Sequence, residues 1–279
     1  MNLSALEKLD RRWLFLLMGL LTLIPMFFPL GLAVKPTAPV IAFHDTIAKL
    51  PNGARILFAA DFDPGSRPEM VPMMKTALRQ LFDKRCRVVV TCLWQGGSGI
   101  VDETLEAVVA EYRAKGVELV YGRDYVDLGF KAGNEAVMVL MGAGFVSAFP
   151  QDQRANATAS LPIMREIRDY STVDLLVNIG AGYPGTKEWV QQVNSRFHLP
   201  MVAGCTAVST PEFYPYLQSG QLKGLLGGMA GAAEYERLRN EKGSATRGMD
   251  AQSLAHVFVA LCIVAGNVVH RAKPKGGRA

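Results

Sequence analysis

Two long runs of apolar residues lie near the ends of this 279-residue chain. The first, residues 13–34, has 22 residues without a charged side chain, which is enough for a helix to cross a bilayer core of about 30 Å. A cleaved signal peptide is the alternative, but its apolar region covers only about 7–15 residues and ends at a small-residue cleavage site, which the following KPTAP does not offer. The pattern therefore predicts an uncleaved transmembrane helix.

The second run, residues 254–269, is shorter and contains His256 and Asn267. A buried helix of a soluble protein is the alternative for a run of this length. Counted from residue 251 the run has 19 residues, and a basic polar tail, HRAKPKGGRA, follows it directly. We therefore predict a second transmembrane helix over residues 251–269, in which His256 and Asn267 face another helix because polar groups in lipid need partners.

Strand-like and helix-like patterns alternate between these two runs. Strands are predicted at residues 54–61, 87–94, 117–121, 174–179, 199–204 and 222–226, and the first is a continuous apolar run, as a strand buried on both faces requires. Helical spacing of apolar residues is found at 68–84, 101–115, 133–149, 161–169, 186–197 and 211–219. Such alternation predicts an α/β fold with a Rossmann-like or flavodoxin-like parallel sheet over residues 35–250, flanked by an N-terminal and a C-terminal transmembrane helix.

The net charge of +5 lies in the two tails, residues 1–12 and 270–279. The first tail carries three basic and two acidic side chains and the second four basic and no acidic ones, so the chain between them is neutral. A nucleic-acid groove needs Lys and Arg gathered on the folded domain, which argues against nucleic acid as a partner. Basic residues favour the cytoplasmic side of a membrane. We therefore predict an inner-membrane protein with two spans, both termini cytoplasmic and the α/β domain extracytoplasmic.

Three cysteines in the predicted domain, Cys86, Cys92 and Cys205, argue mildly against that orientation, because free thiols are less common outside the cytosol. Cys86 and Cys92 stand at the two ends of one predicted strand, which is too long for them to pair.

Candidate ligand-binding residues follow the predicted strands, because ligands of such folds bind beyond the carboxyl ends of the strands. The residues that we select are Asp61 and Asp63 after the first strand, Gln95 and Gly97 after the second, and Gly180, Gly182 and Gly185 after the fourth. Arg123 and Asp124 follow the predicted third strand, and Cys205 and Thr206 the fifth. A pocket at this edge would serve a small-ligand sensor or binding protein.

The loop after the fourth strand, GAGYPG, matches G-x-G-x-x-G between a strand and a helix, with Thr186 placed to cap that helix. A dinucleotide is the sharper interpretation, but the motif falls late in the chain and no Asp or Glu follows the fifth strand to hold a ribose. A tight turn with a cap explains the same residues. We predict no cofactor.

Asp61 and Asp63 resemble the D-x-D motif of the haloacid-dehalogenase phosphatases, with Thr91 in the place of their second motif. The resemblance implies a magnesium-dependent hydrolase, but Gly65 departs from the pattern and no pair of acids follows a later strand. The four histidines show no metal-ligand spacing, and no acid orients His198 toward Cys205. We therefore predict no catalytic and no metal-binding residue.

Two segments, FYPYLQSGQLKGLLGGMAGAAEYE and RGMDAQSLAH, resemble a group of bacterial membrane proteins with two spans and no assigned function. The resemblance implies a bacterial membrane setting and no chemistry. Our leading hypothesis is a membrane-anchored interaction or scaffold module, more consistent with a non-enzyme, in contact with lipid and with copies of itself or other membrane subunits. The alternatives are a small-ligand sensor and, third, a metal-dependent hydrolase.

Overall fold

The computed structural model describes residues 10–32 and 35–272. Among them, residues 35–241 form one compact unit, the α/β unit, and residues 10–32 and 242–272 form a second, the helix-pair unit. The predicted tails 1–12 and 270–279 and the end of the predicted span 13–34 fall partly outside the described residues.

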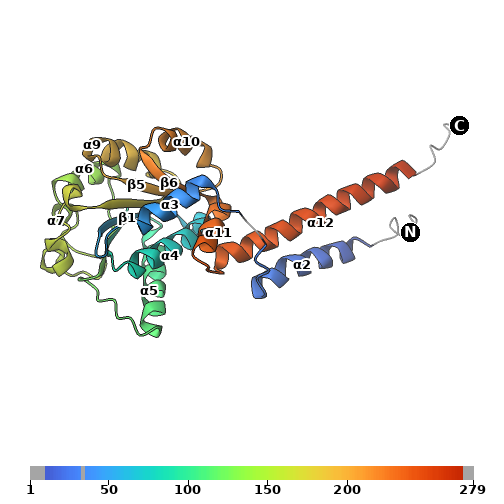
Figure 1. The fold of residues 1–279 in the computed structure, drawn as a ribbon, viewed down its shortest axis with the longest axis horizontal. Coiled ribbons are helices and arrows are strands. Elements are labelled where there is room, and N and C mark those ends of the chain that lie inside the picture. The colour runs from blue at the N-terminus through green and yellow to red at the C-terminus, as the bar shows by residue number, and fades with distance from the viewer. Residues whose placement is uncertain (1–9, 33–34, 273–279) are drawn as a thin grey trace. The chain divides into compact units, whose positions relative to one another are not determined.

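A six-stranded parallel sheet forms the centre of the α/β unit (Figure 1). Its strands are β1 (Arg55–Asp61), β2 (Arg87–Cys92), β3 (Tyr125–Phe130), β4 (Leu175–Gly180), β5 (Met201–Cys205) and β6 (Leu222–Gly227). They lie in the order β3-β2-β1-β4-β5-β6, with every neighbouring pair parallel. The predicted α/β fold is confirmed, with the Rossmann order of strands, which reverses between β1 and β4.

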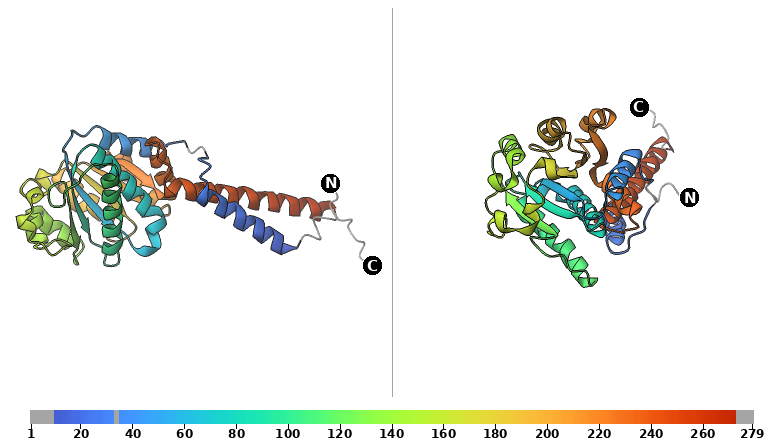
Figure 2. Two further views of the ribbon diagram at one scale, coloured as in Figure 1. Left: turned by 90° about the horizontal axis from the view of Figure 1, so that it is seen from below. Right: turned by 60° about the vertical axis from the view of Figure 1, so that its left-hand side comes forward.

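Helices cover both faces of this sheet (Figure 2). One face carries α3 (Ala38–Ala48), α4 (Arg67–Asp83), α5 (Ser98–Ala114) and α11 (Gly228–Leu238). The other carries α6 (Glu135–Ala143), α7 (Phe145–Ala148), α8 (Thr186–Trp189), the π-helical turn η5 (Val190–Asn194), α9 (Ser195–Phe197) and α10 (Thr210–Gln218). Short 3₁₀ turns complete the connections: η1 (Pro64–Ser66), η2 (Thr158–Ser160), η3 (Pro162–Arg165) and η4 (Tyr170–Thr172).

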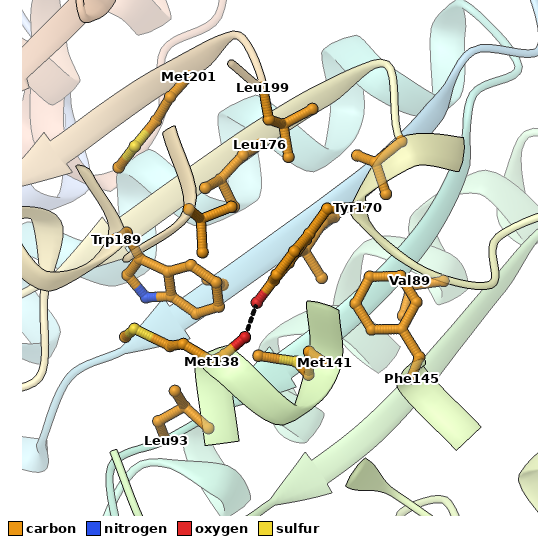
Figure 3. Close-up of a cluster of buried hydrophobic side chains, with 14 of the residues drawn as sticks. Val89, Leu93, Met138, Met141, Phe145, Tyr170, Leu176, Trp189, Leu199 and Met201 are labelled. Carbon is orange, nitrogen blue, oxygen red and sulfur yellow. Dashed lines mark hydrogen bonds between the residues drawn. The ribbon is translucent and has the colours of Figure 1, made fainter. Parts of the chain in front are cut away.

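A large hydrophobic cluster fills the second face, and its two largest members, Trp189 and Tyr170, are completely or almost completely buried. Figure 3 shows them among side chains from α6, α7 and the central strands. The hydroxyl of Tyr170 donates to the carbonyl of Met138 at 2.7 Å, so its one polar atom has a partner inside the core. Burial raises the pKa of Tyr170 above its ordinary value, and the phenol therefore stays neutral.

The sequence pattern predicts the third strand at residues 117–121, and this prediction is wrong. That segment forms only a single bridge at Tyr121, whereas β3 runs from Tyr125 to Phe130. The true strand, YVDLGF, was hidden by Asp127, a charged residue type at a position that the fold buries almost completely. Arg123 and Asp124 consequently precede the strand that they are predicted to follow.

Several predicted helices also differ from the observed ones. The predicted helix 133–149 is interrupted at Gly144, whose φ of 156° no helix adopts, and becomes α6 and α7. Only the 3₁₀ turn η3 forms within residues 161–169, and the helix at 186–197 contains the π-helical turn η5. Helix α3 has no counterpart in the sequence-based prediction.

Asp127 is a buried carboxyl group with an incomplete set of hydrogen bonds. Its Oδ1 accepts from the N–H of Gly129 at 2.8 Å, while its Oδ2 has no partner among the described residues. Burial, together with the nearby carboxylates of Asp102, Asp152 and Glu106, raises the pKa of Asp127 to about 7. The folded protein therefore favours the neutral acid. The contribution of Asp127 to the free energy of unfolding is lost as the pH rises from about 4 through 7.

We expect Asp127→Asn to leave the free energy of unfolding nearly unchanged below pH 4 and to raise it progressively as the pH rises through 7. The amide keeps the acceptor for Gly129 but does not ionise, so it avoids the cost that the wild-type carboxylate meets at high pH. Urea unfolding of both proteins between pH 4 and 8 measures the difference. A constant difference across that range would contradict this account of Asp127.

The helix-pair unit consists of α2 (Arg11–Phe27) and α12 (Ser244–Ala272), which lie side by side (Figures 1 and 2). Among the described residues, only the segment Ser244–Arg271 forms a helix that is long and apolar enough to cross a membrane by length and composition. Helix α2 has 17 residues and ends before Pro29, which disfavours the helical conformation at the preceding residue. It is therefore shorter than the predicted span of residues 13–34.

Candidate functional site

The candidate site is the carboxyl edge of the sheet, where the loops after β1, β2, β3 and β4 meet. Asp61 is the last residue of β1, and its side chain is completely buried. Its Oδ1 accepts from the N–H of Leu93 at 2.8 Å, and its Oδ2 accepts from Trp189 Nε1 at 2.6 Å and from Asn178 Nδ2 at 3.2 Å. Asp61 thus joins the end of β1 to the end of β2, to β4 and to α8.

Burial raises the pKa of Asp61 to about 7, against the opposing effect of these three donors. Its hydrogen-bond partners among the described residues are all uncharged, so the charged form has only neutral dipoles to stabilise it. All three donors belong to the protein itself, on β4, on α8 and just after β2. We therefore assign the Asp61 side chain a structural role, in which it links the ends of these elements.

Asp63 stabilises the turn that follows β1. Its Oδ1 accepts from the N–H of Ser66 at 2.9 Å and from the hydroxyl of Ser66 at 2.8 Å, which caps η1 just before α4. These bonds to Ser66 hold the pKa of Asp63 below its ordinary value. Within residues 10–32 and 35–272, no group of three His, Cys, Asp or Glu side chains is arranged to hold a metal ion.

The loop from Gly180 to Gly185 is packed closely against itself and against Trp94. A Cβ on Gly185 would lie 2.2 Å from the carbonyl oxygen of Gly182, and a Cβ on Gly182 would lie 2.8 Å from the ring of Trp94. Gly180 is also confined, since its Cβ would lie 3.2 Å from the Cα of Gly185. The glycines are therefore required by the compact turn itself.

The start of α8 is already occupied by side chains of the protein. The N–H of Gly185 donates to Glu188 Oε2 at 2.9 Å, which places a carboxylate where a phosphate would bind a helix N-terminus. Thr186 does not cap the helix as predicted, because it is the first helical residue and its hydroxyl donates to Asn178 Oδ1 at 2.8 Å. This arrangement fits the tight turn that is the alternative to a dinucleotide site at this loop.

A hollow of about 220 Å³ opens beside this loop, between the segments that follow β2, β3 and β4. Its lining consists of Leu93, Trp94, Gln95, Phe130, Ala132, Gly133, Asn134, Tyr183 and Pro184. Gln95 is the one predicted site residue that lines it. Gly97 instead stands just before α5 at a point where a Cβ would lie 2.3 Å from the carbonyl oxygen of Phe62, so it allows two loops to approach closely.

Sequence reasoning missed the part of the hollow that follows β3, because the third strand was placed before residue 125. Asn134 has φ 47° and ψ −119°, a conformation that a residue with a side chain rarely adopts. Tyr183 forms the rim, where its hydroxyl donates to the carboxylate of Glu135 at 2.8 Å. The signal that would have found this region is the pair Gly133-Asn134 shortly after the end of β3, a dipeptide typical of turns.

Comparisons with known proteins add little to this geometry. No protein-family model matches the chain, and no curated protein matches it. Among solved structures, it is similar to an α,α-trehalose-phosphate synthase from Burkholderia vietnamiensis, with 12% identity over 85% of this chain and 48% of that one and a TM-score of 0.33. The corresponding synthase from Burkholderia multivorans gives 12% identity, 93% and 50% coverage and a TM-score of 0.31.

The chain spans about half the length of these structures. At such identities and TM-scores the likeness assigns no substrate and no reaction to this protein.

Proposed function

We propose that this chain is a two-span membrane protein, in which α2 and α12 cross the bilayer as an antiparallel pair and anchor the α/β unit as an interaction or scaffold module of an oligomer. The observation that carries the proposal is the large number of exposed apolar side chains on both helices of the helix-pair unit.

The contact between the two helices is narrow. On α2 a row of half-buried or buried positions is spaced by four, three and four residues, at Leu14, Met18, Leu21 and Pro25, with Gly19 and Thr22 beside it. On α12 a row with the same spacing is formed by Ala251, Ala255, Phe258, Cys262, Ala265 and Val269. This is the seam of a left-handed helix pair, and it uses only one side of each helix.

Large apolar side chains cover most of the remaining surface of both helices. On α2 they are Trp13, Phe15, Leu16, Leu17, Leu20, Leu23, Ile24, Met26 and Phe27, and on α12 they are Val257, Val259, Leu261, Ile263, Val264 and Val268. A helix pair in water places charged and polar residues on this outer surface, whereas a pair in lipid gains nothing from them. The exposed surface therefore favours lipid as its surroundings.

Helix lengths are compatible with this arrangement. At about 1.5 Å per residue the 17 residues of α2 reach about 25 Å, close to the hydrocarbon core, and α12 is longer. Where the apolar stretch ends, the carboxylate of Asp250 accepts from the N–H groups of Gly31 and Leu32, each at 2.9 Å. Asp250 thereby accepts hydrogen bonds from two backbone N–H groups in the non-helical segment that follows α2.

Orientation follows from the chain and its charges. The two helices run antiparallel, because the chain leaves α2 for the α/β unit and returns from it into α12. Arg11, Arg12 and Arg271 mark the free ends of the helices, and the sequence adds Lys8, Lys273, Lys275 and Arg278 beyond the described residues. By the preference of Lys and Arg for the cytoplasm, both termini are cytoplasmic and the α/β unit is extracytoplasmic.

Sided labelling tests this topology. In a chain carrying Cys262→Ala, the exposed positions Arg11 and Ala159 are changed to cysteine one at a time and treated in intact cells with a thiol reagent that does not cross membranes. We expect the cysteine at position 159 to be labelled in intact cells and the cysteine at position 11 to be labelled only after the cells are lysed. The reverse pattern would contradict the orientation, and labelling of both in intact cells would contradict the two spans.

A second candidate function is favoured by the hollow at the carboxyl edge. Its lining among the described residues includes no charged side chain, while Trp94, Phe130 and Tyr183 offer rings, and Gln95 and Asn134 offer amides. Such a lining suits a small uncharged ligand with hydrogen-bonding edges. The site lies beyond strand ends, where Rossmann folds bind ligands.

Binding in the hollow is expected to raise the melting temperature of the purified full chain, by mass action. A panel of neutral monosaccharides and nucleosides is screened against the wild type and against Gln95→Ala, which alters an exposed side chain of the lining. The compound that acts at this site stabilises the wild type and stabilises the variant less. An equal shift in both proteins, or no shift with any compound, would count against the ligand-binding function.

A further inference from the structure

Helix α12 also carries a stripe of polar side chains, separate from its half-buried row. From Ala251 to the basic end of the helix, its polar residues are Gln252, Ser253, His256, Asn267 and His270. All except Ser253 are exposed, and at about 100° per residue those four fall within about 60° of arc. Their spacing aligns them along a single face, the polar stripe, with Ala260 and Ile263 between them.

This polar stripe faces away from α2. The row of half-buried α12 positions that we assign to the contact with α2, which includes Phe258 and Cys262, is centred about 130° around the helix from the stripe, again at about 100° per residue. Helix α2 therefore gives the stripe no partner within the part of the chain that the structure describes. The amide of Asn267 donates to the carbonyl of Ile263 in its own helix at 3.0 Å, and no described residue bonds its Oδ1 or the ring of His256.

Polar side chains in the hydrocarbon region are costly without partners, and they drive helices together when a partner presents complementary groups. An asparagine amide has both a donor and an acceptor, so two copies of Asn267 complement each other across a two-fold axis. The spacing of four and three residues through His256, Ala260, Ile263, Asn267 and His270 is that of a self-associating helix, in which a single Asn fixes the register.

We propose that two copies of this chain associate in the membrane through the polar stripe of α12, with Asn267 paired to Asn267 and Ile263 near the two-fold axis. The proposal rests on the two-span arrangement above, and it names the face and the partner of the oligomer. Each copy keeps its own α2 on the far side of α12, so the dimer places the two α12 helices at its centre.

Disulfide cross-linking in isolated membranes tests the proposal. Ile263→Cys and Leu261→Cys are compared in a chain carrying Cys262→Ala. Both positions are exposed and nearly level, but they point about 160° apart around α12. Under mild oxidation we expect Ile263→Cys to give a dimer of the chain at least tenfold more efficiently than Leu261→Cys.

Asn267→Ala in the Ile263→Cys chain is expected to weaken this association about tenfold, and Asn267→Gln to restore part of it, because glutamine keeps both hydrogen-bonding groups. Equal cross-linking at positions 261 and 263, or a mixed disulfide with a different protein at 263, would overturn the proposal. A membrane-bound chain that fails to cross-link contradicts this interface alone, whereas a chain recovered free of the membrane contradicts the two-span arrangement.

Discussion

Replacement of Asp61 by alanine is expected to lower the free energy of unfolding of the α/β unit by about 2–6 kcal/mol, since two buried donors are left without a partner and each costs about 1–3 kcal/mol. The N–H of Leu93 and Nε1 of Trp189 both lose their acceptor, while Asn178 retains a bond to the carbonyl of Ala59. Such a loss is a large part of the roughly 5–15 kcal/mol typical of a whole protein. Urea unfolding of the full chain in detergent measures it.

Two matched variants separate the hydrogen bonds from the loss of volume. Trp189→Phe keeps a large ring in the core but removes the donor at 2.6 Å, and it leaves Asp61 with the bonds from Leu93 and Asn178. Asp61→Asn keeps the shape but offers only one acceptor oxygen. We expect both variants to lose less than Asp61→Ala; a loss below about 1 kcal/mol in all three would contradict the role given to Asp61.

The loss also depends on pH. Since burial raises the pKa of Asp61 to about 7 from an ordinary value near 4, the folded state favours the protonated group. The contribution of Asp61 is therefore fully present below pH 4 and decreases as the pH rises through 7. We expect the difference between wild type and Asp61→Ala to be larger at pH 5 than at pH 8.

Gly224→Ala is expected to lower the free energy of unfolding by about 3 kcal/mol, at the upper end of the usual cost of overpacking. Gly224 lies in β6, and a Cβ there would stand 2.2 Å from the backbone nitrogen of Phe43 and 2.3 Å from its Cα. Because the clash is with backbone, α3 must move away from the sheet. The shift disturbs Phe43, which is completely buried.

Gly99→Ala is the matched control, because no described atom lies within 4 Å of the position its Cβ would take on α5. We expect that change to be neutral or to stabilise by about 0.5–1 kcal/mol through helix propensity. Chemical unfolding of the two variants in parallel gives the comparison. Equal stability of Gly224→Ala and Gly99→Ala would show that β6 and α3 are not as closely packed as described.

The sequence predicted the architecture well where strands are buried on both faces and are continuously apolar. The run ILFAA of β1 is of this kind, and it forms a central strand. The edge strand β3 could not be recognised by the same rule, because Asp127 interrupts its apolar run and its burial depends on tertiary packing. Helix α3 was missed because the predicted membrane span ended only a few residues before it.

The candidate site was predicted less well than the fold. The strand ends place Asp61, Gln95 and Gly182 at one edge of the sheet, as their positions in the sequence suggest. Their spacing along the chain does not reveal that the Asp61 carboxyl group already has hydrogen-bond partners within the protein. Trp189 donates a hydrogen bond to Asp61 although the two residues are 128 positions apart, and no local sequence pattern predicts such a bond. The same holds for Trp94, whose ring confines Gly182.

Extraction of membranes with alkaline carbonate tests most directly whether α2 and α12 lie in lipid. This treatment releases proteins that are held at a membrane by charge or by other proteins, and it leaves those whose helices cross the bilayer. The exposed apolar surface of the helix pair predicts that the intact chain stays in the pellet and is released only by detergent. Recovery of the intact chain in the carbonate supernatant would contradict the account.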